Sequence, residues 1–379
     1  MSSNNPFITV TKSLKNIPLF LCVLLMTSGL VLEAQDVQNS RRMSHKMEIA
    51  RVVGTTKISM TYHSPKVQGR KIFGGIVPYD FVVDNKEYPW RAGSNNRTII
   101  EFEHNVTING QELPAGKYGL LVLVNEKEWT FIFSTDYSWG AFNYNPENNV
   151  LRIKAKVKNR VFQEWLSYDF VDPNPESAGI ELRWENVSAG FTVGLDVSEN
   201  ILADLRDKED KTARDYRVMA IETMKKDPGK LEEALMYLEK ALSKVHTLEG
   251  DYKQAETFFI NILKSDYLIS KGAIEEGKSL KQETIKSSQG FNMYYYALNT
   301  LIVKGDREEA FKLLTANMET NPKQWQAYLA MGEYYLKANN QKKVVENFKR
   351  AYELAPDPSK NYTRYLYLQN KLILERSAP

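Results

Sequence analysis

The sequence has very little thiol and imidazole for its length. It holds one cysteine, Cys22, and four histidines among 379 residues. Cys22 lies in an apolar run near the N-terminus, and without that run the chain has no thiol for a disulfide, a thiolate metal site or a nucleophile. The histidines, at positions 45, 63, 104 and 246, lack the close spacing of metal motifs. We therefore predict no metal site and no cofactor.

Dense basic blocks and the short motifs of common enzyme families are also missing. The 50 Lys and Arg residues are nearly balanced by 47 Asp and Glu. Nothing in this balance supports binding to a phosphate backbone, so nucleic acid is not an expected partner. No Gly-x-Ser-x-Gly elbow, phosphate-binding glycine loop or dinucleotide fingerprint occurs. Catalysis stays open, but the residues favour a protein that is not an enzyme.

The apolar run at the N-terminus is too short for a transmembrane helix. It spans 14 residues, from Leu19 to Leu32, whereas about 20 are needed to cross a bilayer. Lysines precede the run and a polar stretch follows it, which is the order typical of an export signal. We expect residues 1–34 to be a signal peptide and the protein to be exported to the periplasm or cell envelope. The alternative is an uncleaved anchor, which would be the protein's only attachment to a membrane.

From residue 46 to 196 the chain consists of short β-type runs. They are rich in Ile, Val, Phe, Tyr and Trp and are separated by Gly, Pro and Asn. In one run, Ile100 and Phe102 share a face while the glutamates beside them share the other. Asn109-Gly110 is a strong hairpin signal. We predict an all-β antiparallel sandwich for residues 46–196.

The pattern changes after Val197, where Gly and Pro become rare and apolar residues follow helical spacing. Residues 291–324 and 325–358 repeat with a period of 34, the length of a tetratricopeptide unit of two antiparallel helices. The register of residues 244–290 stays open. We predict that residues 198–379 form an all-α tetratricopeptide-like helical repeat array, so the fold class is α+β multidomain.

The last segment is expected to close the array. Tyr362, Tyr365, Leu368 and Leu372 share one face of a predicted helix. We expect this face to cover the preceding repeat and Asn370 to be solvated.

In an array of this kind the first helices of successive repeats line a groove, where amide side chains can clamp an extended peptide. Six residues fall on such positions: Asn292, Tyr295, Asn299, Gln326, Glu333 and Lys337. We predict that a protein or peptide binds this groove. Ordinary helix surface explains the same residues equally well.

Several stretches of the β region form quotable motifs. They are Thr61-Tyr62-His63-Ser64-Pro65-Lys66-Val67-Gln68-Gly69-Arg70-Lys71-Ile72-Phe73-Gly74-Gly75, Val77-Pro78-Tyr79, Trp90-Arg91-Ala92-Gly93-Ser94-Asn95, Leu113-Pro114-Ala115-Gly116-Lys117-Tyr118-Gly119-Leu120 and Trp139-Gly140-Ala141-Phe142. By these motifs residues 46–196 resemble a bacterial family catalogued as domain of unknown function 2911, in which helical repeats often follow. The resemblance implies an organisation but no chemistry, because that family has no established activity. One departure is the link from Asp80 to Pro89, which is longer than usual.

The functional candidate in the β region combines guanidinium groups with flat aromatic rings, which suit carboxylates, sugars or peptide segments. Its members are His63, Arg70, Trp90, Arg91, Asn95 and Trp139. In one interpretation they bind a small ligand or glycan. In the other, the arginines hydrogen-bond loop carbonyls and the tryptophans plug the ends of the sandwich.

Taken together, these patterns predict an exported binding or scaffolding protein of the cell envelope. The helical repeats would engage a protein or peptide, and the β domain would give a second surface. The alternative is an extracytoplasmic enzyme, or a protein binding a carbohydrate or small ligand, that uses the region of Arg70, Trp90 and Arg91. A third hypothesis makes the β domain a rigid spacer.

Overall fold

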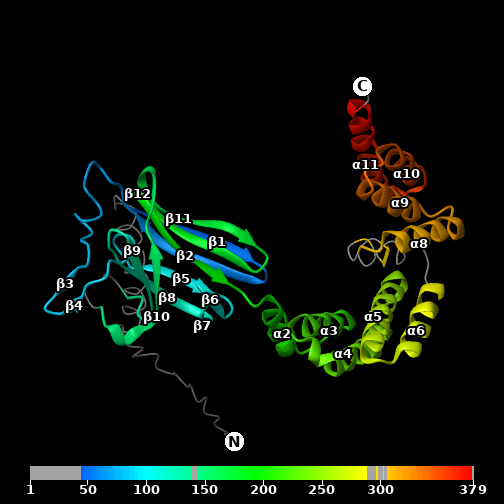
Figure 1. The fold of residues 1–379 in the computed structure, drawn as a ribbon, viewed down its shortest axis with the longest axis horizontal. Helices are drawn as coiled ribbons and strands as arrows, with labels where there is room; N and C mark the ends of the chain where they lie inside the picture. The colour runs from blue at the N-terminus through cyan, green and yellow to red at the C-terminus, as the bar shows by residue number, and fades with distance from the viewer. Residues whose placement is uncertain (1–43, 139–143, 288–295, 298–301, 303–304, 378–379) are drawn as a thin grey trace, which may run out of the picture. The chain divides into compact units, whose positions relative to one another are not determined.

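The computed structural model describes residues 44–138, 144–287, 296–297, 302 and 305–377 (Figure 1). The chain divides into two compact units, Met1–Asn200 and Ile201–Pro379. Antiparallel sheets form the first unit and helices dominate the second, which confirms the predicted fold class. Among the described helices, none is long and apolar enough to span a bilayer.

Two antiparallel sheets build the β unit. The first has the strand order β1 (His45–Val53), β2 (Thr56–Ser64), β5 (Thr98–Phe102), β8 (Gly116–Leu123), β9 (Glu128–Ser134) and β10 (Asn149–Lys156). The second has the order β11 (Lys158–Asn174), β12 (Ser177–Gly194), β6 (Val106–Ile108) and β7 (Gln111–Leu113). Both sheets contribute to one hydrophobic core.

The alternation of side chains along the strands explains this core. In β5, Ile100 and Phe102 are buried and Glu101 is exposed, as predicted. Across the core, the ring centroids of Phe131 and Phe191 lie 5.2 Å apart, which joins the two sheets. The predicted hairpin at Asn109-Gly110 connects β6 and β7, with φ angles of 49° and 83° that fit a type I′ turn.

The long link from Asp80 to Pro89 forms a small hairpin of β3 (Val82–Val83) and β4 (Lys86–Glu87). Its turn residues, Asp84 and Asn85, both have positive φ, which again fits a type I′ turn. The Arg152 guanidinium donates to both carboxylate oxygens of Glu87, at 2.8 and 3.0 Å, and so ties the hairpin to β10. The extra residues therefore add a hairpin outside the two main sheets.

β11 and β12 form a long ribbon that folds back on itself. The Ser188 hydroxyl donates to the Glu181 carboxylate, seven residues away on the same strand. In an extended strand these residues would lie about 23 Å apart, so β12 must reverse between them. Glu185, with φ of 54°, lies at this bend. Where the two halves meet, a Cβ on Gly190 would collide with the Ile180 carbonyl oxygen, so only glycine fits without a shift.

The described helices are α2 (Val197–Asp207), α3 (Ala213–Lys226), α4 (Leu231–Lys244), α5 (Gly250–Lys271), α6 (Ile274–Ser287), α8 (Arg307–Thr320), α9 (Trp325–Lys337), α10 (Gln341–Leu354) and α11 (Asp357–Ser377). Consecutive helices pack as pairs in α3–α4, α5–α6 and α9–α10. Helix α5 has 22 residues, whereas α3 and α4 have 14 each. This extra length explains why residues 244–290 do not register with the other repeats.

Close packing of α9 on α10 agrees with the predicted two-helix repeat of residues 325–358. Val344, Phe348 and Ala351 of α10 are buried. A Cβ on Gly332 of α9 would collide with the Phe348 ring, so the glycine lets the two helices approach. The tetratricopeptide pattern of small and aromatic residues is therefore a packing pattern here.

The prediction for α11 is wrong. Tyr362, Tyr365, Leu368 and Leu372 are 46–62% exposed, whereas Asn370, expected in solvent, is 4% exposed. The helix packs through its other face, which has Leu366 and Tyr367 against α9 and α10. Polar residues suit this face because their hydrogen bonds are made: the Gln341 amide donates to Asn370 Oδ1 at 3.0 Å, and the Thr363 hydroxyl donates to the Ser359 carbonyl at 3.1 Å.

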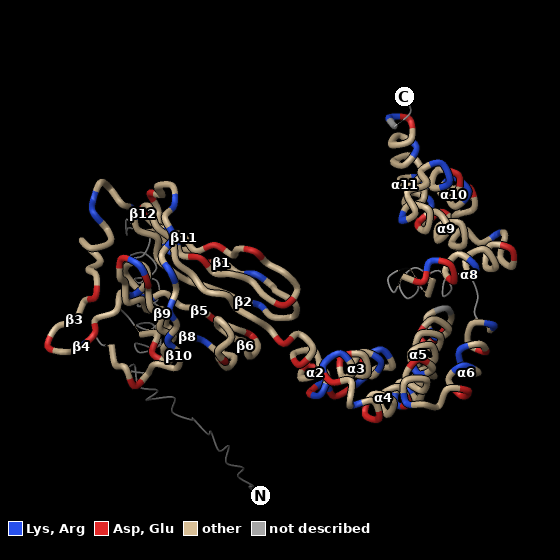
Figure 2. The backbone as a smooth tube through the Cα atoms, viewed as in Figure 1, with Lys and Arg blue, Asp and Glu red and all other residues tan. Residues whose placement is uncertain are grey.

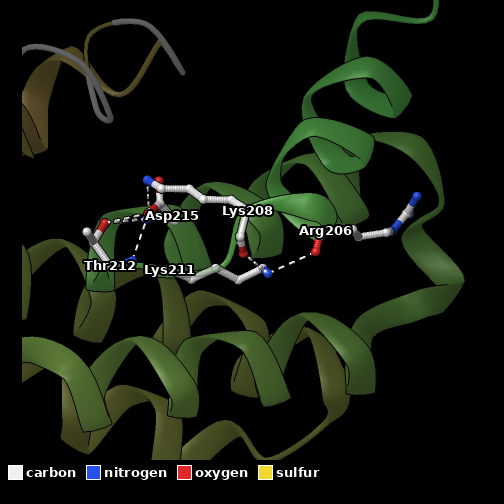
Figure 3. A network of polar contacts seen from close by, with 5 residues as sticks. All are labelled: Arg206, Lys208, Lys211, Thr212 and Asp215. Carbon is white, nitrogen blue, oxygen red and sulfur yellow. Dashed lines mark hydrogen bonds and ion pairs between the residues drawn. The ribbon is translucent and has the colours of Figure 1, made fainter. Parts of the chain in front are cut away.

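A polar network fixes the corner between α2 and α3 (Figure 3). Thr212 and Asp215 form a capping box at the start of α3. The Lys208 ammonium lies 2.6 Å from the Asp215 carboxylate, and the Lys211 ammonium donates to the Arg206 carbonyl at 2.9 Å, near the end of α2. Burial would raise the pKa of Asp215, but the bonds from Lys208 and Thr212 outweigh it and lower that pKa.

Candidate functional site

The motif Trp90–Asn95 forms a loop whose polar side chains donate to backbone carbonyls. Trp90 Nε1 donates to the Gly93 carbonyl at 2.9 Å, and Arg91 Nη1 donates to the Asn95 carbonyl at 2.7 Å. Burial lowers the pKa of Arg91. The Asn95 amide donates to the Ser44 carbonyl at 3.4 Å. Both predicted polar members of this loop, Arg91 and Asn95, are thus directed at backbone carbonyls.

The centre of the same loop is fixed to the core. The Ala92 carbonyl accepts from the Thr98 hydroxyl at 2.9 Å and from the Tyr168 hydroxyl at 2.8 Å. Burial raises the pKa of Tyr168 well above its usual value, so the phenol keeps the proton that it donates. Ala92 has φ of 56° and is fully buried. The Trp90–Asn95 motif therefore forms a loop that is hydrogen-bonded both within itself and to the core.

The other members of the predicted patch have separate surroundings. His63 is buried on β2, and its carbonyl accepts from the Ser94 N–H at 3.2 Å, which places it beside the loop. Arg70 lies in another loop, where its guanidinium donates to the Val67 carbonyl at 3.0 Å and to the Lys66 carbonyl at 2.6 Å. Trp139 lies outside the described residues.

Trp90 also belongs to an aromatic cluster. Its ring stacks on Trp184 with centroids 6.0 Å apart, and Phe73 contacts both rings edge-on. Phe73 also lies 4.8 Å from Trp129. The structure thus brings Trp90, Arg91 and Asn95 together in one loop, with His63 of β2 beside it, and the hydrogen bonds of the loop residues are made to backbone carbonyls.

A cavity of about 600 Å³ lies where the ribbon of β11 and β12 folds back. Its charged lining comes from Lys156, Lys158, Arg160, Asp172 and Glu181. Its neutral lining includes Asn109, Ser177, Thr192 and the backbone of Gly179 and Gly190. It is a polar cavity between β10, β11, β12 and the turn that follows β6.

Arg160 is held in this cavity by a buried partner. Its Nη2 donates to Glu181 Oε1 at 2.6 Å, and its Nε donates to Glu181 Oε1 at 3.1 Å and to the Ser188 hydroxyl at 3.0 Å. Burial would raise the pKa of Glu181, but the bonds from Ser188 and Arg160 and the charges of Arg160 and Lys158 lower it. Glu181 is therefore ionised at neutral pH and fixes the guanidinium plane.

The predicted groove is only partly described. Gln326, Glu333 and Lys337 share one face of α9, because they are seven and four residues apart. Asn292, Tyr295 and Asn299 lie outside the described residues.

A cleft of about 410 Å³ lies on the other side of α9. It is lined by α8, α9 and α10, with Phe311, Tyr335 and Lys343 among the lining residues. Tyr335 lies roughly 200° around the helix from Glu333. The Lys343 ammonium lies 4.7 Å from the centroid of the Tyr335 ring and donates to its hydroxyl at 3.2 Å. The cleft and the predicted groove therefore use opposite faces of α9.

The β unit matches the model of one protein family. Residues 44–193 match the family described as "Protein of unknown function (DUF2911)". The β unit is thus similar to this family over residues 44–193. No curated protein matches the chain.

Solved structures similar to the chain are tetratricopeptide proteins and MamA proteins. YrrB, titled a TPR protein with an unusual peptide-binding site, is 18% identical, with 48% of this chain and 86% of YrrB covered and a TM-score of 0.24. A MamA point mutant is 18% identical, with coverages of 46% and 91% and a TM-score of 0.23. MamA from Desulfovibrio magneticus RS-1 is 15% identical, with coverages of 45% and 100% and a TM-score of 0.22.

Sequence reasoning missed the cavity of the β unit, although a signal for it exists. Basic residues occupy every second position from 152 to 160: Arg152, Lys154, Lys156, Lys158 and Arg160. Side chains of a strand alternate between its faces, so such a run predicts one basic face. Along the whole chain, Lys and Arg are interspersed with Asp and Glu (Figure 2), so the net charge does not reveal this local run of basic residues. Within the described residues, no group of three His, Cys, Asp or Glu side chains could hold a metal ion.

Proposed function

We propose that the protein is an exported binding protein of the cell envelope whose helical unit binds a protein partner. The observation that carries the binding proposal is an exposed apolar stripe on α11. Export and envelope localisation are supported by the sequence of residues 1–34 alone.

The stripe consists of Tyr365, Leu368 and Leu372, which are 62%, 47% and 46% exposed. Their spacing of three and four residues places them on one side of the helix. The opposite side of α11 already packs against α9 and α10 through Leu366 and Tyr367. Large apolar side chains gathered on one exposed face are typical of protein interaction sites.

The chemistry of α11 favours an amphipathic helix with acidic flanks as the partner segment. A spacing of three and four residues is the seam along which helices pair. Helix α11 has a net charge of 4 − 2 = +2. Its basic residues are Lys360, Arg364, Lys371 and Arg376, and its acidic residues are Asp357 and Glu375. Acidic residues flanking the apolar face of the partner would complement this charge.

Site-specific photocrosslinking tests the proposal. A photoreactive residue at Leu368 in the full chain, expressed in its native host, should form an adduct with one envelope protein. The same residue at Met236, an equally exposed apolar position on α4 (45%), is the control and should not form that adduct. Equal adducts at both positions, or none at Leu368, would overturn the proposal.

The identified partner, once purified, then allows a quantitative test. Tyr365→Ser with Leu368→Gln and Leu372→Gln should weaken binding at least about tenfold, since burial of each such side chain stabilises an interface by about 1.5–3 kcal/mol. Unfolding should change little, because exposed substitutions usually shift stability by within about 0.5 kcal/mol. If this variant binds the partner with unchanged affinity and Lys337→Ala binds it more weakly, the binding site is instead the predicted groove on α9.

Export has its own test. Cleavage after Ala34 predicts an exported protein that begins at Gln35, which N-terminal sequencing of the envelope fraction would show. An intact Met1 terminus in the membrane fraction would indicate an uncleaved anchor instead.

A further inference from the structure

We propose that the cavity at the fold-back of β11 and β12 binds a small polar ligand that carries a carboxylate or phosphate group. The evidence lies in the partners of the five basic residues at alternate positions from 152 to 160. It is independent of the partner proposed for α11.

Three of the five basic residues are neutralised within the fold. Arg152 pairs with Glu87 at 2.8 Å, Lys154 with Glu128 at 2.8 Å, and Arg160 with Glu181 at 2.6 Å. These pairs explain the outer members of the series as structural charges.

Lys156 and Lys158 differ from the other three. Neither forms an ion pair with any residue that the structure describes, and both line the cavity. The basic residues of the lining are Lys156, Lys158 and Arg160, and its acidic residues are Asp172 and Glu181. The net charge of the lining is therefore 3 − 2 = +1. The cavity lining thus carries two ammonium groups that form no ion pair with a described residue, although the charge of Lys158 also helps to lower the pKa of Glu181.

Arg160 adds a fixed donor to this charge. Glu181 and Ser188 engage its Nε and Nη2, and its Nη1 makes no hydrogen bond with a described residue. A guanidinium held in one plane by a buried acid has already lost the freedom that ligand binding would remove. Arginine in such a setting favours planar oxyanions, such as carboxylates, and phosphates.

The size and polarity of the cavity limit the kinds of ligand that it could bind. A volume of about 600 Å³ lies within the range of roughly 300–1,000 Å³ common for small-molecule sites. The neutral lining of Asn109, Ser177 and Thr192 offers amide and hydroxyl groups for the uncharged part of a ligand. A sugar acid or a phosphorylated small molecule meets both conditions, whereas an apolar ligand does not.

Calorimetric titration of the full chain at low ionic strength tests this. The probes are glucuronate, inorganic phosphate and glucose, the last a neutral molecule of similar size to glucuronate. Glucuronate or phosphate should bind, glucose should not, and added salt should weaken the binding. Binding of the carboxylate probe alone, or of phosphate alone, identifies which group the site takes. Absence of binding by both anions, or equal binding of glucose, would overturn the proposal.

The lysines are tested by substitution. Lys156→Gln with Lys158→Gln should weaken binding of the anionic probe by at least about tenfold, because each ammonium group would lose a charge-assisted hydrogen bond to the anion. Lys57→Gln, on an exposed part of β2 away from the cavity, is the matched control and should bind as the wild type does. Melting temperatures should agree among the three proteins. Anion affinity that is unchanged in the double variant would show that binding occurs elsewhere on the surface.

Discussion

The two units of the chain bury their apolar side chains in different ways. In the β unit both sheets share a single core that extends from Val53 to Val193. In the helical unit the buried residues fall into separate clusters between neighbouring helices, such as the one around Phe348. A perturbation of the β core should therefore affect the whole unit, whereas a perturbation of one helical cluster should stay near its own repeat.

Phe348→Ala gives the largest expected effect. Removing this buried ring should destabilise the packing of α9, α10 and α11 by about 3–5 kcal/mol. Amide hydrogen exchange should then quicken in these helices and stay unchanged in α3 and α4. Phe131→Ala in the β core is the counterpart, and there the protection should fall across both sheets together. Uniform quickening along the helical unit in Phe348→Ala would show that its clusters act as one core.

Gly190→Ala tests the fold-back of the ribbon. The added methyl group would collide with the Ile180 carbonyl, so the halves of β12 must separate, at a cost of about 3 kcal/mol. Thermal unfolding of the β unit measures this loss. Gly229→Ala, in the helical unit, is the comparison: its methyl group would approach only the Asp227 side chain, and it should leave the melting of the β unit unchanged. Equal melting of the two variants would contradict the close contact in the ribbon.

Asn200→Ala tests where the β unit ends. The amide is 5% exposed and donates to the buried Thr56 hydroxyl at 3.0 Å. Losing this bond should lower the free energy of unfolding of the β unit by about 1–2 kcal/mol. A fragment of residues 44–196 should show a similar loss relative to one of residues 44–207. The exposed Asn186→Ala is the control, and equal stability of the two fragments would place the boundary at 196.

Asp215→Asn should have the smallest effect, and one that depends on pH. The folded pKa of Asp215 lies below its ordinary value of 3.8, so its ionised form stabilises α3 at neutral pH. This stabilisation is lost as pH falls through the folded pKa. At pH 7 the substitution should lower the free energy of unfolding by about 1 kcal/mol, the usual contribution of a helix cap. Denaturant unfolding should show the difference shrinking below about pH 4, whereas a constant difference would exclude the charge as its cause.

Much of the fold could be predicted from sequence because its signals are local. Alternation identified the face of β5, the Asn109-Gly110 pair identified the hairpin of β6 and β7, and the 34-residue period predicted the helix pair of α9 and α10. The face of α11 could not be predicted in the same way. Hydrophobicity ranks Tyr365 above Asn370, but the buried position of Asn370 depends on a hydrogen bond from Gln341, 29 residues away.

The candidate sites were harder to predict for the same reason. Arg91 and Asn95 were chosen for their chemistry, yet the structure directs both at backbone carbonyls. The cavity depends on the reversal of β12, which brings Arg160 to Glu181 across 21 residues. A strand pattern gives the face of a side chain but not the bend that encloses it.

Strand β1 has a consequence for the protein in concentrated solution. Among the described strands it has a neighbour on one side only, β2, so its other edge presents backbone groups that a second chain could pair with. Lys46, Glu48 and Arg51 place charges of both signs along that strand. Charged side chains on an edge disfavour the addition of a strand from another molecule. Replacing them with β-branched apolar residues would therefore turn a charged sheet edge into one that can pair with a strand of another molecule.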